Sequence, residues 1–260
     1  MPNRIDQCFH GLRAKDEKAF IAYICAGDPD LPRTVELALA LENAGTDILE
    51  LGIPFSDPLA DGVVNQLAAQ RALAAGATVP GVLDCVRQIR RRSEIPIVLY
   101  TYLNPIFQFG LDRFHREANE AGVDGLLILD LPPEEDQPGE SPLHIRLIAP
   151  TTPPERMERI CARAAGFIYY VSREGVTGAQ TSVASSLGER VAQIRRCTEL
   201  PIAVGFGIST AEQAREVARI ADAIVVGSAI VEQINEQSGA GDMAERIRKF
   251  VEPLVGATKE

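Results

Sequence analysis

The chain has 260 residues, of which 46% are hydrophobic and 24% charged, a composition typical of a globular protein rather than a disordered or collagen-like one. Its formal net charge of −10 argues against a broad basic face of the kind that binds nucleic acid or an anionic membrane. We therefore expect neither nucleic acid nor a membrane as a partner.

Cysteine and histidine are sparse and scattered. The five cysteines form no C-x-x-C pair, and the three histidines lack the spacing of metal ligands, so neither a disulfide framework nor a metal site is expected. No apolar run reaches the ~18 residues of a membrane span. Residues 1–20 contain no apolar signal-peptide region. These features predict a soluble protein of the cytoplasm, or of the plastid stroma if a transit peptide has been removed.

Strand-like and helix-like patterns alternate along the chain. Residues 1–18 are expected to form an N-terminal helix that covers the bottom of the fold. Amphipathic patterns predict helices at 31–45, 111–122, 153–166, 186–197 and 210–220. Eight short apolar runs predict strands at 19–27, 47–53, 95–101, 124–130, 144–150, 166–172, 201–207 and 222–228.

This alternation allows two architectures, an open doubly wound sheet or a closed (β/α)8 barrel. Most of the apolar runs are continuous, as in parallel strands that are buried on both faces. The first strand-to-helix turn has no G-x-G-x-x-G motif, and the strands number eight, so we predict an α/β protein with a single (β/α)8 barrel domain over 1–260.

Two connections are unusually long. Residues 52–66 are rich in Pro, Asp and Gly, and residues 171–186 are rich in Gly, Ser and Thr. Both follow strands, so both are expected at the C-terminal face of the barrel, where barrel enzymes keep their active sites. We predict that these two segments are active-site loops.

Three carboxylates stand near this face. Glu50 interrupts the apolar run 47–53, where a buried carboxyl group could act as an acid or a base, or could be a structural side chain hydrogen-bonded to a neighbouring strand. Asp57 and Asp61 lie in the following loop, where turn formation or helix capping would also explain them. Even so, two carboxylates on adjacent chain segments would make a plausible acid/base pair.

Glycines and tyrosines also cluster at the predicted strand ends. The segments 205–209 and 227–231 each carry glycine after a strand, a pattern typical of phosphate loops, although tight turns would use the same residues. Gly178 could add a third backbone amide. Four tyrosines, at positions 23, 100, 102 and 169, could line a cavity for a flat aromatic substrate or could simply belong to the core.

The run LELGIPFSDPLADG (49–62) resembles the signature of the tryptophan synthase alpha chain family. Four further segments resemble this family in the family's order: AYICAGDPD (22–30), YVSREGVTGA (170–179), VGFGIS (204–209) and VVGSAIV (225–231). The resemblance covers nearly the whole chain. It implies the cleavage of indole-3-glycerol phosphate to indole and glyceraldehyde 3-phosphate, with no metal and no organic cofactor.

The resemblance also assigns roles to individual residues. It makes Glu50 the proton-transfer group and Asp61 the acceptor for the indole N–H, with Thr177 orienting Asp61 when the loop closes. It makes Asp57 and Pro58 face a partner, the beta chain of an α2β2 assembly. The phosphate-binding residues would be Gly178, Phe206, Gly207, Gly227 and Ser228, and the indole pocket would be lined by Tyr23, Tyr100, Leu127 and Tyr169.

The sequence departs from the family pattern in three places. Cys25 stands where many members have Thr, and Val63 where many have Pro. Between Asp130 and Ile145, where most members place a helix, the chain carries four prolines and one glycine, so we expect a shortened or irregular fourth βα unit.

Alternatives to the full alpha-chain function are a stand-alone lyase that needs no partner and a non-catalytic subunit that only activates a beta chain. A different phosphosugar barrel, such as a phosphoribosyl isomerase, would fit the phosphate loops but would leave residues 51–61 unexplained.

Overall fold

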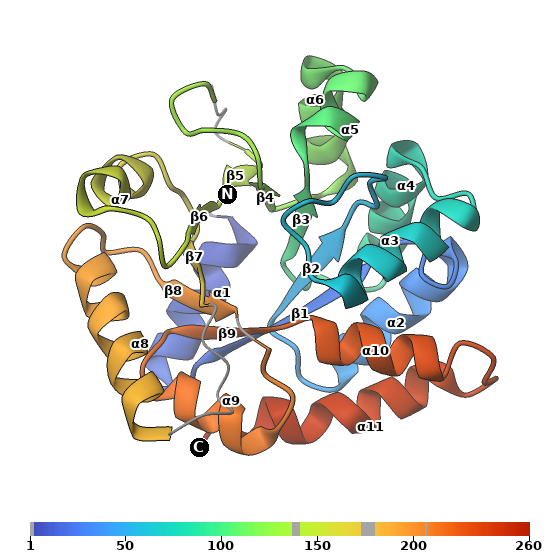
Figure 1. The fold of residues 1–260 in the computed structure, drawn as a ribbon. Coiled ribbons are helices and arrows are strands. Elements are labelled where there is room, and N and C mark those ends of the chain that lie inside the picture. The colour runs from blue at the N-terminus through green and yellow to red at the C-terminus, as the bar shows by residue number, and fades with distance from the viewer. Residues whose placement is uncertain (1–2, 137–140, 173–179, 206) are drawn as a thin grey trace.

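The computed structural model describes residues 3–136, 141–172, 180–205 and 207–260. All strand pairs are parallel, and the strand order is β5-β4-β3-β2-β1-β9-β8-β7-β6 (Figure 1). The strands are β1 (Ala19–Cys25), β2 (Ile48–Gly52), β3 (Ile97–Thr101), β4 (Gly125–Ile128), β5 (Leu143–His144), β6 (Arg146–Ile148), β7 (Ile168–Val171), β8 (Ile202–Gly205) and β9 (Ala223–Val226).

The two ends of this strand order meet in the chain. β5 pairs with β4 and β6 pairs with β7, and only Ile145 separates β5 from β6. The backbone N–H of Ile145 donates to the carbonyl of Leu126 at 2.9 Å. β5 and β6 are therefore two halves of one strand, the ring contains eight strands in the predicted places, and the (β/α)8 barrel is confirmed.

Helices surround the ring (Figure 1). They are α1 (Arg4–Ala14), α2 (Leu31–Asn43), α3 (Val63–Ala74), α4 (Val79–Arg90), α5 (Leu103–Phe109), α6 (Leu111–Ala121), α7 (Pro154–Cys161), α8 (Gln180–Arg195), α9 (Ala211–Ala218), α10 (Ser228–Glu236) and α11 (Met243–Gly256).

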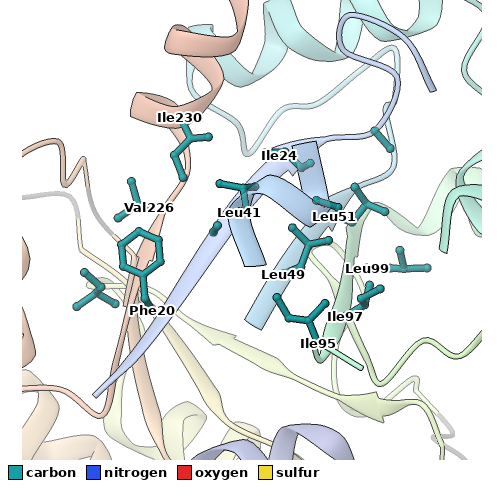
Figure 2. Packing of buried hydrophobic residues seen from close by; sticks show 14 of the residues in the cluster. Phe20, Ile24, Leu41, Leu49, Leu51, Ile95, Ile97, Leu99, Val226 and Ile230 are labelled. Carbon is teal, nitrogen blue, oxygen red and sulfur yellow. The ribbon is translucent and has the colours of Figure 1, made fainter. Parts of the chain in front are cut away.

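Strand periodicity divides the side chains between two layers. Leu49 and Leu51 join the large cluster between strands and helices, which also contains Leu41 of α2 and Ile230 of α10 (Figure 2). Successive strand residues point to opposite faces. Glu50, between the two leucines, therefore points into the barrel, where it shares a cavity with side chains from several other strands.

Helix α1 packs at the N-terminal ends of the strands and spans residues 4–14. Asn3 caps this helix, because its side-chain oxygen accepts a hydrogen bond from the backbone N–H of Ile5 at 2.9 Å. Ile5, Phe9 and Leu12 are buried in one cluster with residues of the barrel interior, among them Phe167. This apolar plug leaves the opposite, C-terminal end as the open face.

The fourth βα unit has no helix among its described residues, 129–136 and 141–142, in agreement with the proline-based prediction. Polar contacts occupy this side of the barrel instead. The buried Asp136 carboxylate bonds to His144 of β5 and to Arg146 of β6. The His144 ring stacks on His115 of α6 with ring centroids 5.3 Å apart.

Both predicted active-site loops are shorter than expected where the chain is described. Helix α3 begins at Val63, inside the predicted loop 52–66, and α8 begins at Gln180, inside the predicted loop 171–186. The start of α3 was hard to predict because its buried residues are all alanines (Ala68, Ala69 and Ala72), which give a weak apolar periodicity. The start of α8 was hard to predict because its first turns are rich in small polar residues.

No helix in the described part of the chain is both long and apolar enough to cross a bilayer. The same residues contain no cluster of three His, Cys, Asp or Glu side chains arranged to hold a metal ion.

Candidate active site

A cavity of about 760 Å³ opens at the C-terminal ends of the strands. Its size lies within the ~300–1,000 Å³ range of small-molecule sites. Side chains or backbone from β1, β2, β3, β6, β7, β8 and β9, and from neighbouring loops, contribute to its wall. The lining includes Tyr23, Glu50, Asp61, Asn65, Tyr100, Leu129, Leu147, Tyr169, Ser172, Gly205, Gly207, Gly227 and Ser228.

Glu50 lies at the bottom of this cavity. It is only 1% exposed, and neither carboxyl oxygen has a hydrogen-bond partner among the described residues. Burial in this apolar setting, with the charge of Asp61 as a second cause, raises its pKa from 4.5 to about 8. The Glu50 side chain therefore carries a proton near neutral pH and faces the space where a ligand would sit.

Asp61 stands in the connection between β2 and α3. Residues 57–61 fold into a tight turn, in which the N–H of Leu59 donates to the carbonyl of Asp57 at 2.9 Å and the N–H of Asp61 donates to the carbonyl of Pro58 at 3.0 Å. This turn brings the carboxylate of Asp61 back over the ends of β2 and β3.

Hydrogen-bond donors surround the Asp61 carboxylate. The Tyr100 hydroxyl donates to Oδ1 at 2.7 Å, and the Tyr102 hydroxyl donates to Oδ2 at 2.8 Å. Burial raises the pKa of Asp61, while hydrogen bonds from Tyr100, Tyr102 and Asn65 oppose that rise. The two carboxyl groups in this cavity thus have different surroundings, since among the described residues Glu50 has no donor and Asp61 has three.

Tyrosines form the wall beside these acids. The rings of Tyr23 and Tyr100 meet edge to face with centroids 5.1 Å apart. Tyr169 of β7 lines the same cavity. Burial raises the pKa of Tyr23, Tyr100 and Tyr169 well above the ordinary value, so all three remain neutral hydroxyl donors. Leu127, which was expected in the indole pocket, belongs to the barrel-interior cluster and is the register partner of Tyr100 across β3 and β4. The cavity wall contains Leu129 in its place.

Backbone amides at α10 face the same cavity. Gly227 precedes the first residue of α10, and the first intrahelical bond joins the N–H of Val231 to the carbonyl of Gly227. The N–H groups of residues 228–230 therefore have no acceptor within the helix. Free N–H groups of this kind are what binds an anion at a helix N-terminus. A Cβ atom at Gly227 would lie 3.2 Å from Cδ1 of Tyr23, so the tight fit against that ring favours glycine.

The second predicted phosphate loop is described in part. Gly207 has a positive φ of 37° and lines the cavity. Helix α9 begins only at Ala211, after a capping box formed by Thr210 and Gln213, so residues 205–209 lead to the helix rather than open it. Thr177, Gly178 and Phe206 lie outside the described residues.

Asp57 and Pro58 lie at the rim and do not line the cavity. Asp57 is exposed, and its carboxylate accepts a hydrogen bond from the Ser56 hydroxyl at 2.6 Å. Large apolar side chains are exposed nearby, including Leu59 at 91% and Val63 at 69%. On the neighbouring helix α5, Phe107 is 62% exposed.

The sequence did not predict two hydrogen bonds to Asp61, those from Tyr102 and Asn65. It indicated Tyr102 only as a candidate cavity residue, and it did not indicate Asn65. The contact of Tyr102 with Asp61 joins positions 41 apart, so nothing local in the sequence could reveal it. Asn65 has a weak local signal, since it follows Asp61 by one helical turn.

The comparisons with known proteins agree on one family. The model of the family described as "Tryptophan synthase alpha chain" matches residues 9–259. The tryptophan synthase alpha chain of Opitutus terrae is 51% identical over 264 residues, covering 99% of each chain. That of Citrifermentans bemidjiense is 47% identical over 258 residues, covering 97% of this chain and 96% of the relative.

Solved structures give the same answer. Tryptophan synthase subunit alpha from Legionella pneumophila superposes with a TM-score of 0.89 at 40% identity, covering 99% of both chains. A chain of the Mycobacterium tuberculosis tryptophan synthase superposes with a TM-score of 0.89 at 33% identity, covering 100% of both chains.

Proposed function

The chain belongs to the tryptophan synthase alpha chain family, whose reaction is the cleavage of indole-3-glycerol phosphate to indole and glyceraldehyde 3-phosphate, and we propose that Glu50 and Asp61 carry that reaction here. The observation that supports this most directly is that one cavity holds both a buried Glu50, with no hydrogen-bond partner in the described part of the chain, and an Asp61 with three donors. Burial raises the pKa of both carboxyl groups, but hydrogen bonds from Tyr100, Tyr102 and Asn65 oppose the rise at Asp61. Two carboxyl groups in such different surroundings are suited to be acid and base in one step.

Each carboxyl group would have its own task. The protonated Glu50 delivers a proton to the indole ring carbon that leaves the glycerol chain. Asp61, as a carboxylate, accepts the hydrogen bond of the indole N–H and stabilises the positive charge that forms on the protonated ring. The ionised Glu50 then takes the proton of the adjacent glycerol hydroxyl as the C–C bond breaks, which returns it to its starting form.

The remaining wall would hold the two ends of the substrate. Tyr23, Tyr100 and Tyr169 offer an apolar pocket with a rigid shape for the indole ring. Gly207, Gly227 and Ser228 offer backbone amides for the phosphate, and the N-terminal dipole of α10 favours the anion although the protein as a whole is acidic. Gly178 and Phe206 would complete the phosphate site and Thr177 would orient Asp61.

The test of the function is indole production from indole-3-glycerol phosphate, with and without a tryptophan synthase beta chain. We expect indole from this chain in both mixtures, and more of it with the beta chain. Equal turnover in both would indicate a stand-alone lyase. No indole in either mixture, together with acceleration of the beta reaction, would indicate a non-catalytic subunit and would contradict the proposal.

For the partner, we propose the beta chain of an α2β2 tryptophan synthase, docked over the rim of the cavity. The support is the exposed apolar surface made by Leu59, by Val63 at the start of α3 and by Phe107 on α5, next to the exposed Asp57 and the half-buried Pro58. The Tyr102 hydroxyl accepts a hydrogen bond from the N–H of Ala60 at 3.0 Å, which holds this loop beside the start of α5. Exposed apolar surface of this kind commonly marks a protein interface.

Replacing Phe107 with aspartate is expected to weaken binding to the beta chain by about 30-fold or more, because a charge would enter an apolar contact. Isothermal titration calorimetry of the two chains measures this. Leu73→Asp is the matched control, because Leu73 is also a large apolar residue that is exposed. It lies outside the proposed surface, ten positions beyond Val63 and therefore about 15 Å further along α3. Equal weakening by both variants, or by neither, would contradict this docking surface.

A further inference from the structure

The carboxylate of Asp61 is held on both oxygens by tyrosine hydroxyls. Tyr100 donates to Oδ1 at 2.7 Å and Tyr102 donates to Oδ2 at 2.8 Å. Hydrogen bonds from a neutral hydroxyl to a carboxylate are short and strong because the acceptor is charged. The two bonds reach opposite oxygens, so together they fix both the position and the rotation of the carboxylate.

The two tyrosines differ in where they sit. Tyr102 follows the end of β3, is buried against Phe55 at a centroid distance of 5.4 Å, and accepts the N–H of Ala60 with the same hydroxyl. It thus supports the backbone of the loop as well as the side chain of Asp61. Tyr100 lies within β3 itself, is half-buried and lines the cavity, so its hydroxyl points from a rigid strand straight to Asp61.

The bond from Tyr100 also discriminates between the two acids. Glu50 and Asp61 share the cavity, and both have a raised pKa because of burial. Hydrogen bonding to the charged form of a carboxyl group favours that form. Because the tyrosine hydroxyls reach Asp61 and leave Glu50 without a partner among the described residues, they favour the ionised form at Asp61 only.

We propose that Tyr100 is a positioning residue whose hydroxyl keeps Asp61 ionised and aimed at the indole nitrogen, so that Tyr100 is more than a wall of the indole pocket. This inference rests on the proposed role of Asp61. The hydrogen bond to Oδ1 leaves further lone pairs on the carboxylate, which has about four acceptor sites in all. An indole N–H can therefore be accepted without displacing either tyrosine.

The test is Tyr100→Phe, which keeps the ring and removes the hydroxyl. We expect kcat for indole formation to fall by about tenfold, as for loss of one charge-assisted hydrogen bond, with KM changed by less than about twofold because the ring wall remains. Without this donor Asp61 binds its proton more tightly. The acidic limb of the kcat profile should therefore move to higher pH, by roughly one unit.

Tyr169→Phe is the comparison variant, because it removes a hydroxyl from the same cavity at a side chain for which no hydrogen bond to Asp61 is present. Its acidic limb should stay at the wild-type pH. The inference is overturned if Tyr100→Phe leaves both kcat and the acidic limb unchanged, or if Tyr169→Phe shifts the limb equally.

A third variant separates this inference from the proposed function. Asp61→Asn should lower kcat more strongly than Tyr100→Phe, because it removes the charge itself. If Asp61→Asn keeps the wild-type kcat, the proposed role of Asp61 fails, and the inference fails with it. If Asp61→Asn is impaired while Tyr100→Phe matches wild type in kcat and in pH profile, the proposed function survives and only the role of Tyr100 is lost.

Discussion

Glu50→Gln is expected to lower kcat for indole-3-glycerol phosphate cleavage by about 10²–10⁴-fold, the usual contribution of a positioned general acid or base. Glutamine has nearly the shape of glutamic acid but cannot donate a proton that it later recovers. Glu50 is fully buried and makes no hydrogen bond with the residues that the structure describes, so glutamine would lose none of their contacts. Steady-state indole release, measured with saturating substrate, gives the effect directly.

Two controls make this result specific to chemistry. Binding of a glycerol phosphate analogue to the Gln variant should remain close to wild type, because the phosphate amides lie at α10 and not at β2. Glu158→Gln, at an exposed position of α7, should have wild-type turnover. Full activity of the Glu50 variant would refute the assignment of Glu50, whatever the behaviour of the controls.

The second large effect concerns stability against pH. Glu50 has a pKa of about 8 in the folded chain and 4.5 as its reference value, so the folded state binds the proton more tightly than the unfolded state. The stabilising contribution of the protonated group is fully present below the unfolded pKa and is lost as pH rises through the folded one. At about 1.4 kcal/mol per pKa unit, the loss between these limits is roughly 4–5 kcal/mol.

Urea unfolding of the wild type and of Glu50→Gln across this window isolates the contribution. The wild type should lose stability relative to the variant between about pH 5 and about pH 8.5, because glutamine never ionises. Other carboxyl groups titrate equally in both proteins and cancel in the difference. A constant difference across the window would show that Glu50 is not desolvated as the structure describes.

The strand ring was predictable because its pattern is local. Most strands carry a continuous apolar run, as expected for strands that are buried on both faces in a parallel barrel. Glu50 was recognised for the same reason, since a charge is conspicuous where every neighbour is apolar. The irregular fourth βα unit, which has no helix in its described residues 129–136 and 141–142, was predictable because the prolines of this segment lack the N–H that a helix interior needs.

The contacts that give the carboxyl groups their character were not predictable in this way. Whether Asp61 meets a tyrosine hydroxyl depends on how β3 and the loop after β2 meet across 39 and 41 positions of chain. The motif 49–62 identified the acids by resemblance, whereas only the fold reveals which of them has donors. The starts of α3 and α8 were placed too late because alanine and small polar residues give little periodic signal.

The buried contacts of Asp136 with His144 and Arg146 lie on a side of the barrel whose connection can vary in length. On the side of the barrel from β4 to β6, the described cavity wall consists of aliphatic or backbone surface such as Leu129, Leu147 and Ala149, whereas the acids come from β2 and the loop that follows it. A sector that supplies no reacting group can change length without disturbing proton transfer. Changes of length between β4 and β5 should accordingly leave the catalytic apparatus intact, provided that they keep Asp136 in place to pair with the buried His144 and Arg146.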